Sequence, residues 1–294
     1  MSGTILAILS GVSMGVGGLA YRIGDRGRVL PVQLMTTMGL CGCLLFAFLA
    51  RGEWAAFSPI AALLGVVSGV TQYATIRLLK EAMRRGPLAP PWCAISLGGF
   101  VPVIVFSFLF LNERPGAWQL ASVLCSCIAI AAASLGQRGG GGRSSGVRQM
   151  ALYGLLLISL LLTVGVLNIL LKYALTLPGA HAGENLMQSN GRVLMFFAYA
   201  GIAISSATDV TLSRKWVFNR YAWFGSLVLT VGGLGAYLLI LSILDLPAVT
   251  VFTLCNIVSI LTVALGSVLI FGEKTSRSWY AMLALSLLAI LLNR

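Results

Sequence analysis

Long runs of apolar residues follow one another along the chain, separated by short polar or Pro/Gly-rich breaks. A bilayer core about 30 Å thick needs roughly 20 residues of helix, and the runs have about this length. They are continuously apolar and lack the alternation of membrane β-strands, so the expected fold class is all-α integral membrane. The ten predicted transmembrane helices are 4–21, 31–50, 59–79, 90–111, 116–136, 150–171, 185–206, 221–244, 247–271 and 276–292.

A polar segment near the middle of the chain separates these helices into two groups of five. Residues 137–149, QRGGGGRSSGVRQ, have the composition of a flexible linker. We therefore predict a first five-helix repeat at 1–136 and a second at 150–294.

The two halves also share sequence. A shift of 160 residues aligns 62–113 with 222–273 without a gap and pairs Pro87 with Pro247. Because each half has an odd number of predicted helices, the second copy enters the membrane inverted relative to the first. Inverted repeats are typical of secondary transporters, in which the substrate site lies near the middle of the membrane between the halves.

The composition agrees with a membrane location and excludes a water-soluble enzyme. Hydrophobic residues make up 58% of the chain, charged residues 10%, and the mean hydropathy is +0.95. Soluble domains are about 45–50% apolar and about 25% charged. No nucleophile, base and orienting group can be assembled within the predicted helices, so we expect no enzymatic activity.

The cysteines and the histidine do not form a metal site. Two cysteine pairs have C-x-C spacing, which on a helix turns the second side chain about 200° from the first. The single histidine, His181, cannot complete a zinc ligand set. We expect no metal or cofactor, and cysteines that act as small buried hydrophobic residues. All six lie in apolar runs: Cys41, Cys43, Cys93, Cys125, Cys127 and Cys255.

The basic residues are distributed unevenly among the loops. The net charge is +12, and 15 of the 20 Lys and Arg residues lie in or beside the loops that follow odd-numbered predicted helices. The positive-inside rule then places these loops in the cytoplasm and both termini outside. No aromatic interleaving or binding module accompanies the charge, so we expect no nucleic-acid partner.

Two segments carry a family resemblance: FLNERPGAWQLASVLCSCIAIAAAS from Phe110 and IFGEKTSRSWYAMLALSLLAILLN from Ile270. In each, a long apolar helix leads through a short turn containing Glu113 or Glu273 into a last helix rich in small residues. With the five-plus-five arrangement, the chain resembles the drug/metabolite transporter superfamily, in its EamA-like branch. The resemblance implies a multi-pass transporter of the bacterial cytoplasmic (inner) membrane. It also implies both termini inside, opposite to the orientation that the charges favour.

The seventh predicted helix carries the leading candidate site. Asn185, Gln188 and Arg192 have i, i+3, i+7 spacing and share one face, which continues to Tyr199. A guanidinium on such a face suits a carboxylate or phosphate, which it binds through two parallel hydrogen bonds. The alternative stays open that Arg192 extends to the interface or pairs with Glu184.

Other polar or aromatic residues within the helices are candidate substrate ligands: Gln72, Tyr73, Arg77, Asn168, Asn256, Tyr237 and Trp92. Alternatives are an interfacial position for Arg77 and Trp92, and hydrogen bonds between helices for the two asparagines. Arg22 and Lys172, at matched ends of the first helix of each half, are candidate gates or anchors. Pro102 predicts a kink in the fourth helix.

Acidic residues are rare, with 8 Asp and Glu in the chain. Asp209 and Asp245 fall at the ends of predicted helices, where capping is the simpler role. No acidic residue falls near the middle of a predicted helix, so the sequence identifies no carboxylate that could couple transport to protons.

These features together predict a secondary transporter that moves a small polar, anionic or zwitterionic metabolite by alternating access. The expected partners are the lipid bilayer and the metabolite. The alternative is a flippase subunit for a lipid-linked substrate, or a membrane scaffold without solute transport. A central cavity favours transport, a lateral groove favours flipping, and a filled interior favours a scaffold.

Overall fold

The computed structural model describes residues 3–85, 89–99, 101–110, 116–135, 147–179, 183–213, 216–246, 248–272 and 277–292. Regular structure in these ranges is helical apart from one isolated bridge between Pro178 and Asn185, which confirms the all-α class. The helices are α1 (Gly3–Arg26), α2 (Pro31–Leu49), the one-turn η1 (Trp54–Ala56), α3 (Pro59–Met83), α4 (Ala89–Gly98), α5 (Val101–Phe110), α6 (Ala117–Leu135), α7 (Val147–Thr176), α8 (Leu186–Ser213), α9 (Arg220–Asp245), α10 (Ala248–Leu269) and α11 (Arg277–Leu292).

Seven helices in the described part of the chain are long and apolar enough to cross a bilayer, namely α1, α2, α3, α7, α8, α9 and α10. Shorter apolar helical segments cover 94–110 and 120–129. The chain is therefore a multi-pass membrane protein. The crossing of the bilayer by all ten predicted helices stays a prediction.

The fourth predicted helix is interrupted. α4 ends at Gly98, and α5 begins at Val101 with Pro102 in its first turn. Proline has no amide proton and fits the first turn of a helix better than its interior, which accounts for the break predicted at this residue. Gly165 of α7 makes room for the ring, since a Cβ added there would lie 2.5 Å from Pro102 Cγ.

The linker boundary needs a correction. Residues 137–146 lie outside the described residues, but Val147–Gln149 form the first turn of α7 instead of the end of a linker. The helix therefore begins three residues before its predicted start at residue 150.

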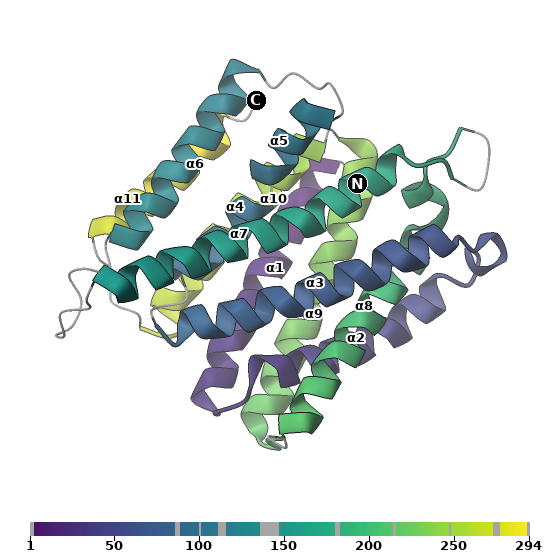
Figure 1. Cartoon of the computed structure of the whole chain (residues 1–294), viewed down its shortest axis with the longest axis horizontal. Coiled ribbons are helices and arrows are strands. Elements are labelled where there is room, and N and C mark those ends of the chain that lie inside the picture. Colours follow the sequence, from purple (N-terminus) through teal and green to yellow (C-terminus); the bar gives the residue numbers. More distant parts are fainter. Residues whose placement is uncertain are drawn as a thin grey trace.

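Helices from the two halves of the chain pack against one another in a reciprocal pattern (Figure 1). The first helix of the first half, α1, packs along α9 and α10, while the first helix of the second half, α7, packs along α3, α4 and α5. The pairs α2–α8 and α6–α11 lie at opposite edges of the bundle in Figure 1.

Glycines allow the closest of these approaches. A Cβ added at Gly232 of α9 would lie 2.3 Å from the Cα of Gly17 on α1. Small residues of this kind let helix backbones pack directly in a membrane. Gly232 therefore serves helix packing, because a side chain at this position would meet backbone.

We expect Gly232→Ala to destabilise the protein by about 1–3 kcal/mol, because the added methyl group forces α1 away from α9. Gly154→Ala is the matched control, since Gly154 also lies within a helix and a Cβ there meets nothing within 4 Å. The measurement is the melting temperature in detergent. Equal melting temperatures for the two variants would contradict the close α1–α9 contact.

Candidate functional site

A cavity of about 200 Å³ lies in the centre of the bundle, bordered by helices from both halves. Its wall is mostly apolar, and the lining residues that the structure describes include no Asp, Glu, Lys or Arg. The polar and aromatic side chains that line it include Tyr21, Ser68, Gln72, Thr75, Trp92, Ser96, Asn168, Tyr199, Phe252, Asn256 and Ser259. Hydrogen-bonding groups in an otherwise apolar enclosure are the usual form of a small-molecule site.

Two aromatic residues of the wall are held by hydrogen bonds. The Trp92 indole N–H donates to Ser259 Oγ at 3.1 Å, and the Tyr199 hydroxyl donates to the Gly233 carbonyl at 2.6 Å. Trp92 is 9% exposed, so its alternative interpretation as an interfacial residue is wrong. Its ring packs against Gly18 of α1, where a Cβ would lie 2.7 Å from the indole.

The two asparagines of the cavity use their amide nitrogens on their own helices. Asn168 Nδ2 donates to the Val164 carbonyl at 3.0 Å, and Asn256 Nδ2 donates to the Phe252 carbonyl at 2.7 Å. The Asn256 amide also covers the α4–α5 break, because a Cβ added at Gly99 would lie 2.1 Å from its nitrogen. These bonds leave the amide oxygens as acceptors for a ligand.

Ser68 adds an unsatisfied group to the same enclosure. Its Oγ is buried and has no hydrogen-bond partner among the described residues. Gln72 lies one helical turn further along the same face of α3. A buried hydroxyl without a partner is costly, and Ser68 lies in the wall of the cavity.

The polar face predicted for the seventh helix is interrupted in the structure. α8 changes direction at Asn190, where φ is −137° and ψ is 19°. Before the break, Asn185 and Gln188 cap the helix reciprocally: the Gln188 N–H donates to Asn185 Oδ1, and the Asn185 N–H donates to Gln188 Oε1, each at 2.9 Å. The prediction of one continuous stripe through Arg192 is therefore wrong.

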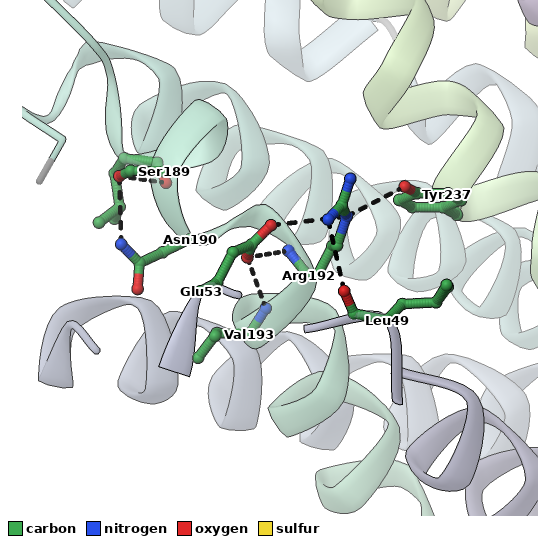
Figure 2. A network of polar contacts seen from close by, with 8 residues as sticks. Leu49, Glu53, Ser189, Asn190, Arg192, Val193 and Tyr237 are labelled. Atoms are coloured by element: carbon green, nitrogen blue, oxygen red, sulfur yellow. Dashed lines mark hydrogen bonds and ion pairs between the residues drawn. The ribbon is translucent and has the colours of Figure 1, made fainter. Parts of the chain in front are cut away.

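Arg192 lies just after the break and contacts three other elements (Figure 2). Its Nε lies 3.5 Å from Glu53 Oε1 and donates to the Tyr237 hydroxyl at 3.3 Å, while Nη1 donates to the Leu49 carbonyl at 3.3 Å. Its partner is thus Glu53, not Glu184. The guanidinium is not part of the cavity wall.

Glu53 also binds the backbone exposed by the break. Its Oε2 accepts hydrogen bonds from the N–H groups of Arg192 at 2.9 Å and Val193 at 3.2 Å. The next loop residues reinforce the contact, because the Ser58 N–H donates to Asn190 Oδ1 at 3.1 Å. A carboxylate at the start of a helical segment is also favoured by the helix dipole.

Arg77 forms an ion pair with Asp209 of α8, and Tyr73 borders this pair. The expectation that Asp209 only caps a helix is wrong, because its carboxylate lies against a guanidinium of another helix. Asp245 has no described side chain. Neither Tyr73 nor Arg77 belongs to the cavity wall.

The two candidate gates are not among the lining residues of the cavity. Arg22 forms a 3.6 Å ion pair with Asp25 one turn along α1. Lys172 is buried on α7, with 6% of its surface exposed. Of the predicted ligands, the structure brings together Gln72, Asn168, Asn256 and Trp92 at the cavity, and it groups Arg192 with Tyr237 elsewhere.

Sequence reasoning missed Glu53 and Ser68. Glu53 is the single acidic residue between the second and third predicted helices, but no local pattern links it to a residue 139 positions away. Ser68 resembles any small residue at a helix contact. The Asn-x-x-Gln capping pattern at Asn185 was a signal that could have been recognised.

Comparison with known proteins supports this description. Residues 1–135 match the EamA-like transporter family. The similarity is to a membrane transporter family and covers these residues alone. The match confirms the resemblance predicted from sequence, and it agrees with a membrane transporter.

No curated protein matches the sequence. Among 22 matching chains of known structure, one crystal structure described only as that of a protein has a TM-score of 0.71 at 18% sequence identity. The alignment covers 99% of this chain and 95% of that chain. At this identity the similarity shows a shared fold.

Burial raises the pKa of the Glu53 carboxyl above its ordinary value, and the Val193 and Arg192 N–H groups and the Arg192 charge offset this only in part. Because the folded-state pKa is raised, the contribution of Glu53 to stability is complete at low pH and is lost as the pH rises above the ordinary value of about 4.3. We expect the melting temperature of the parent, relative to Glu53→Gln, to fall across this window. A melting-temperature difference between parent and Glu53→Gln that rises with pH would contradict the raised pKa of Glu53.

Proposed function

We propose that the protein is a secondary transporter that moves a small polar metabolite by alternating access between two inverted halves, 1–136 and 150–294. The central cavity between the halves is the observation that carries this proposal. The EamA-like match and the apolar helices support it. The proposed arrangement has all ten predicted helices crossing the membrane, in the bacterial cytoplasmic membrane.

Repeat-related residues meet at the cavity. The shift of 160 residues pairs Gln72 with Gly232, and Ser96 with Asn256, and all four line it. Further lining pairs with the same shift are Gly69/Leu229, Ile76/Ala236, Trp92/Phe252 and Ile95/Cys255. A wall built from equivalent positions of two copies supports an inverted repeat with the site on its pseudo-twofold axis.

The lining chemistry narrows the proposed cargo. The expectation of an anionic substrate depended on Arg192, which is paired with Glu53. The wall instead offers amide, hydroxyl and aromatic groups, and burying a net charge there without a partner would be costly. We therefore propose a cargo without net charge that combines hydrogen-bonding groups with an apolar part. The volume of about 200 Å³ limits it to a small metabolite.

The cavity also favours a transporter over a membrane scaffold. A scaffold without transport has no need for polar side chains around an open centre, since each costs stability. Gln72, Asn168, Asn256 and Trp92 are the proposed ligands. Arg192, Arg77, Arg22 and Lys172 are proposed to act outside the binding cavity.

The test is transport by purified protein in proteoliposomes, after a thermal-shift screen with neutral amino acids, nucleosides and polyols. A ligand that binds only the folded state raises the melting temperature. We expect Gln72→Leu and Asn256→Leu each to weaken binding of the selected ligand about twofold to tenfold, the effect of one lost hydrogen bond.

Thr71→Val is the matched control, because the Thr71 hydroxyl donates to the Val67 carbonyl of its own helix and Thr71 is not a lining residue. Parent-like transport by both cavity variants would overturn the site. Transport of anions alone would overturn the proposed cargo class.

A further inference from the structure

Two polar clusters join the halves of the chain, and each combines an acid, an arginine and a tyrosine. The first cluster is Glu53, Arg192 and Tyr237, described above. The second cluster is Asp209, Arg77 and Tyr73. In both clusters the acid belongs to one half of the chain and is grouped with a residue from the third helix of the other half. That residue is Tyr237 of α9 for Glu53, and Arg77 of α3 for Asp209.

The clusters lie at opposite ends of the cavity. Along α8 the order is Arg192, then the lining residues 194–202, then Asp209. At 1.5 Å per residue, Arg192 and Asp209 are about 25 Å apart along the helix. α3 runs beside α8 in the same direction, because Gly65 packs on Leu194 and Gly69 packs on Ala198.

The repeat relates the two clusters to each other. Arg77 of α3 and Tyr237 of α9 occupy equivalent positions under the shift of 160 residues. Glu53 follows α2, the second helix of the first half, and Asp209 lies in the last turns of α8, the second helix of the second half. Each end of the cavity thus joins the third helix of one half to an acid at the end of the second helix of the other.

The side chains of both ion pairs are partly exposed at the surface of the protein. The side chain of Arg192 is 45% exposed and that of Glu53 is 15% exposed, while Arg77 and Asp209 are 51% and 19% exposed. Partly exposed ion pairs are individually weak, so a rearrangement of the surrounding helices can separate them.

We propose that these clusters are the two gates of the transport path: the Glu53–Arg192–Tyr237 cluster closes one end, and the Asp209–Arg77–Tyr73 cluster closes the other. The inference rests on the proposed alternating access. Opening toward one side of the membrane separates one ion pair while the other holds. Glu53 also seals the broken backbone of α8, so its departure frees the start of that helical segment to move.

The chain contains a reporter for this motion. Cys255 lines the cavity between the two clusters and is 1% exposed. With the other five cysteines replaced by alanine, its rate of modification by a membrane-impermeant methanethiosulfonate reagent measures access from one side of a vesicle. Right-side-out and inside-out vesicles expose opposite sides of the protein to the reagent.

We expect Glu53→Gln to increase labelling of Cys255 several-fold from one side, and Asp209→Asn to increase it several-fold from the opposite side. Arg192→Gln and Arg77→Gln should reproduce the respective effects and replace either acid variant that does not fold. Glu81→Gln is the matched control, because its ion pairs within the described part of the chain are with Arg84 and Arg85 of its own segment.

An increase from the same side for both acid variants, parent-like labelling in both, or an equal increase in Glu81→Gln would overturn the gates. The proposed function is tested separately by transport in the parent. If the two acid variants change labelling from opposite sides but no metabolite is transported, the gates stand and the transporter function is overturned. If the parent transports a metabolite but labelling is unchanged in both variants, the transporter function stands and the gates are overturned.

Discussion

Lipid offers no hydrogen-bond partners, so a helix can be interrupted within the bilayer only where the protein itself satisfies the freed backbone groups. α8 is interrupted at Asn190, and the carboxylate of Glu53 accepts from the two amides that follow. This contact fixes the loop between α2 and α3 and draws the Arg192 side chain toward α9. At the end of α4 the Gly99 N–H donates to the Ile95 and Ser96 carbonyls, Pro102 brings no N–H to the first turn of α5, and the Asn256 amide packs against Gly99.

Close packing of the remaining helices places the cavity. Gly17 and Gly232 bring α1 against α9, and Gly65 and Gly69 bring α3 against α8. Dense contacts at these crossings leave space at the centre, where the longer amide and aromatic side chains end. An unsatisfied Ser68 hydroxyl at this place has a cost that packing alone does not explain.

The candidate site could be predicted only in part. Gln72, Asn168 and Asn256 were identifiable because polar residues are rare in apolar helices and have to face the interior. The stripe from Asn185 to Arg192 was misjudged, because helical periodicity assumes an unbroken helix. Glu53 could not be found, since its role depends on a contact between residues 139 positions apart.

Hydropathy and length are properties of each segment by itself, so the amino-acid order is enough to predict apolar helices, a membrane environment, the break at Pro102 and the EamA-like character of the first half. Which side of each helix faces the cavity depends on rotation and crossing, which are set by glycine contacts between helices distant in the chain. Only packing of the whole chain could therefore pair Arg192 with Glu53 and Arg77 with Asp209, and leave the amides facing an uncharged centre.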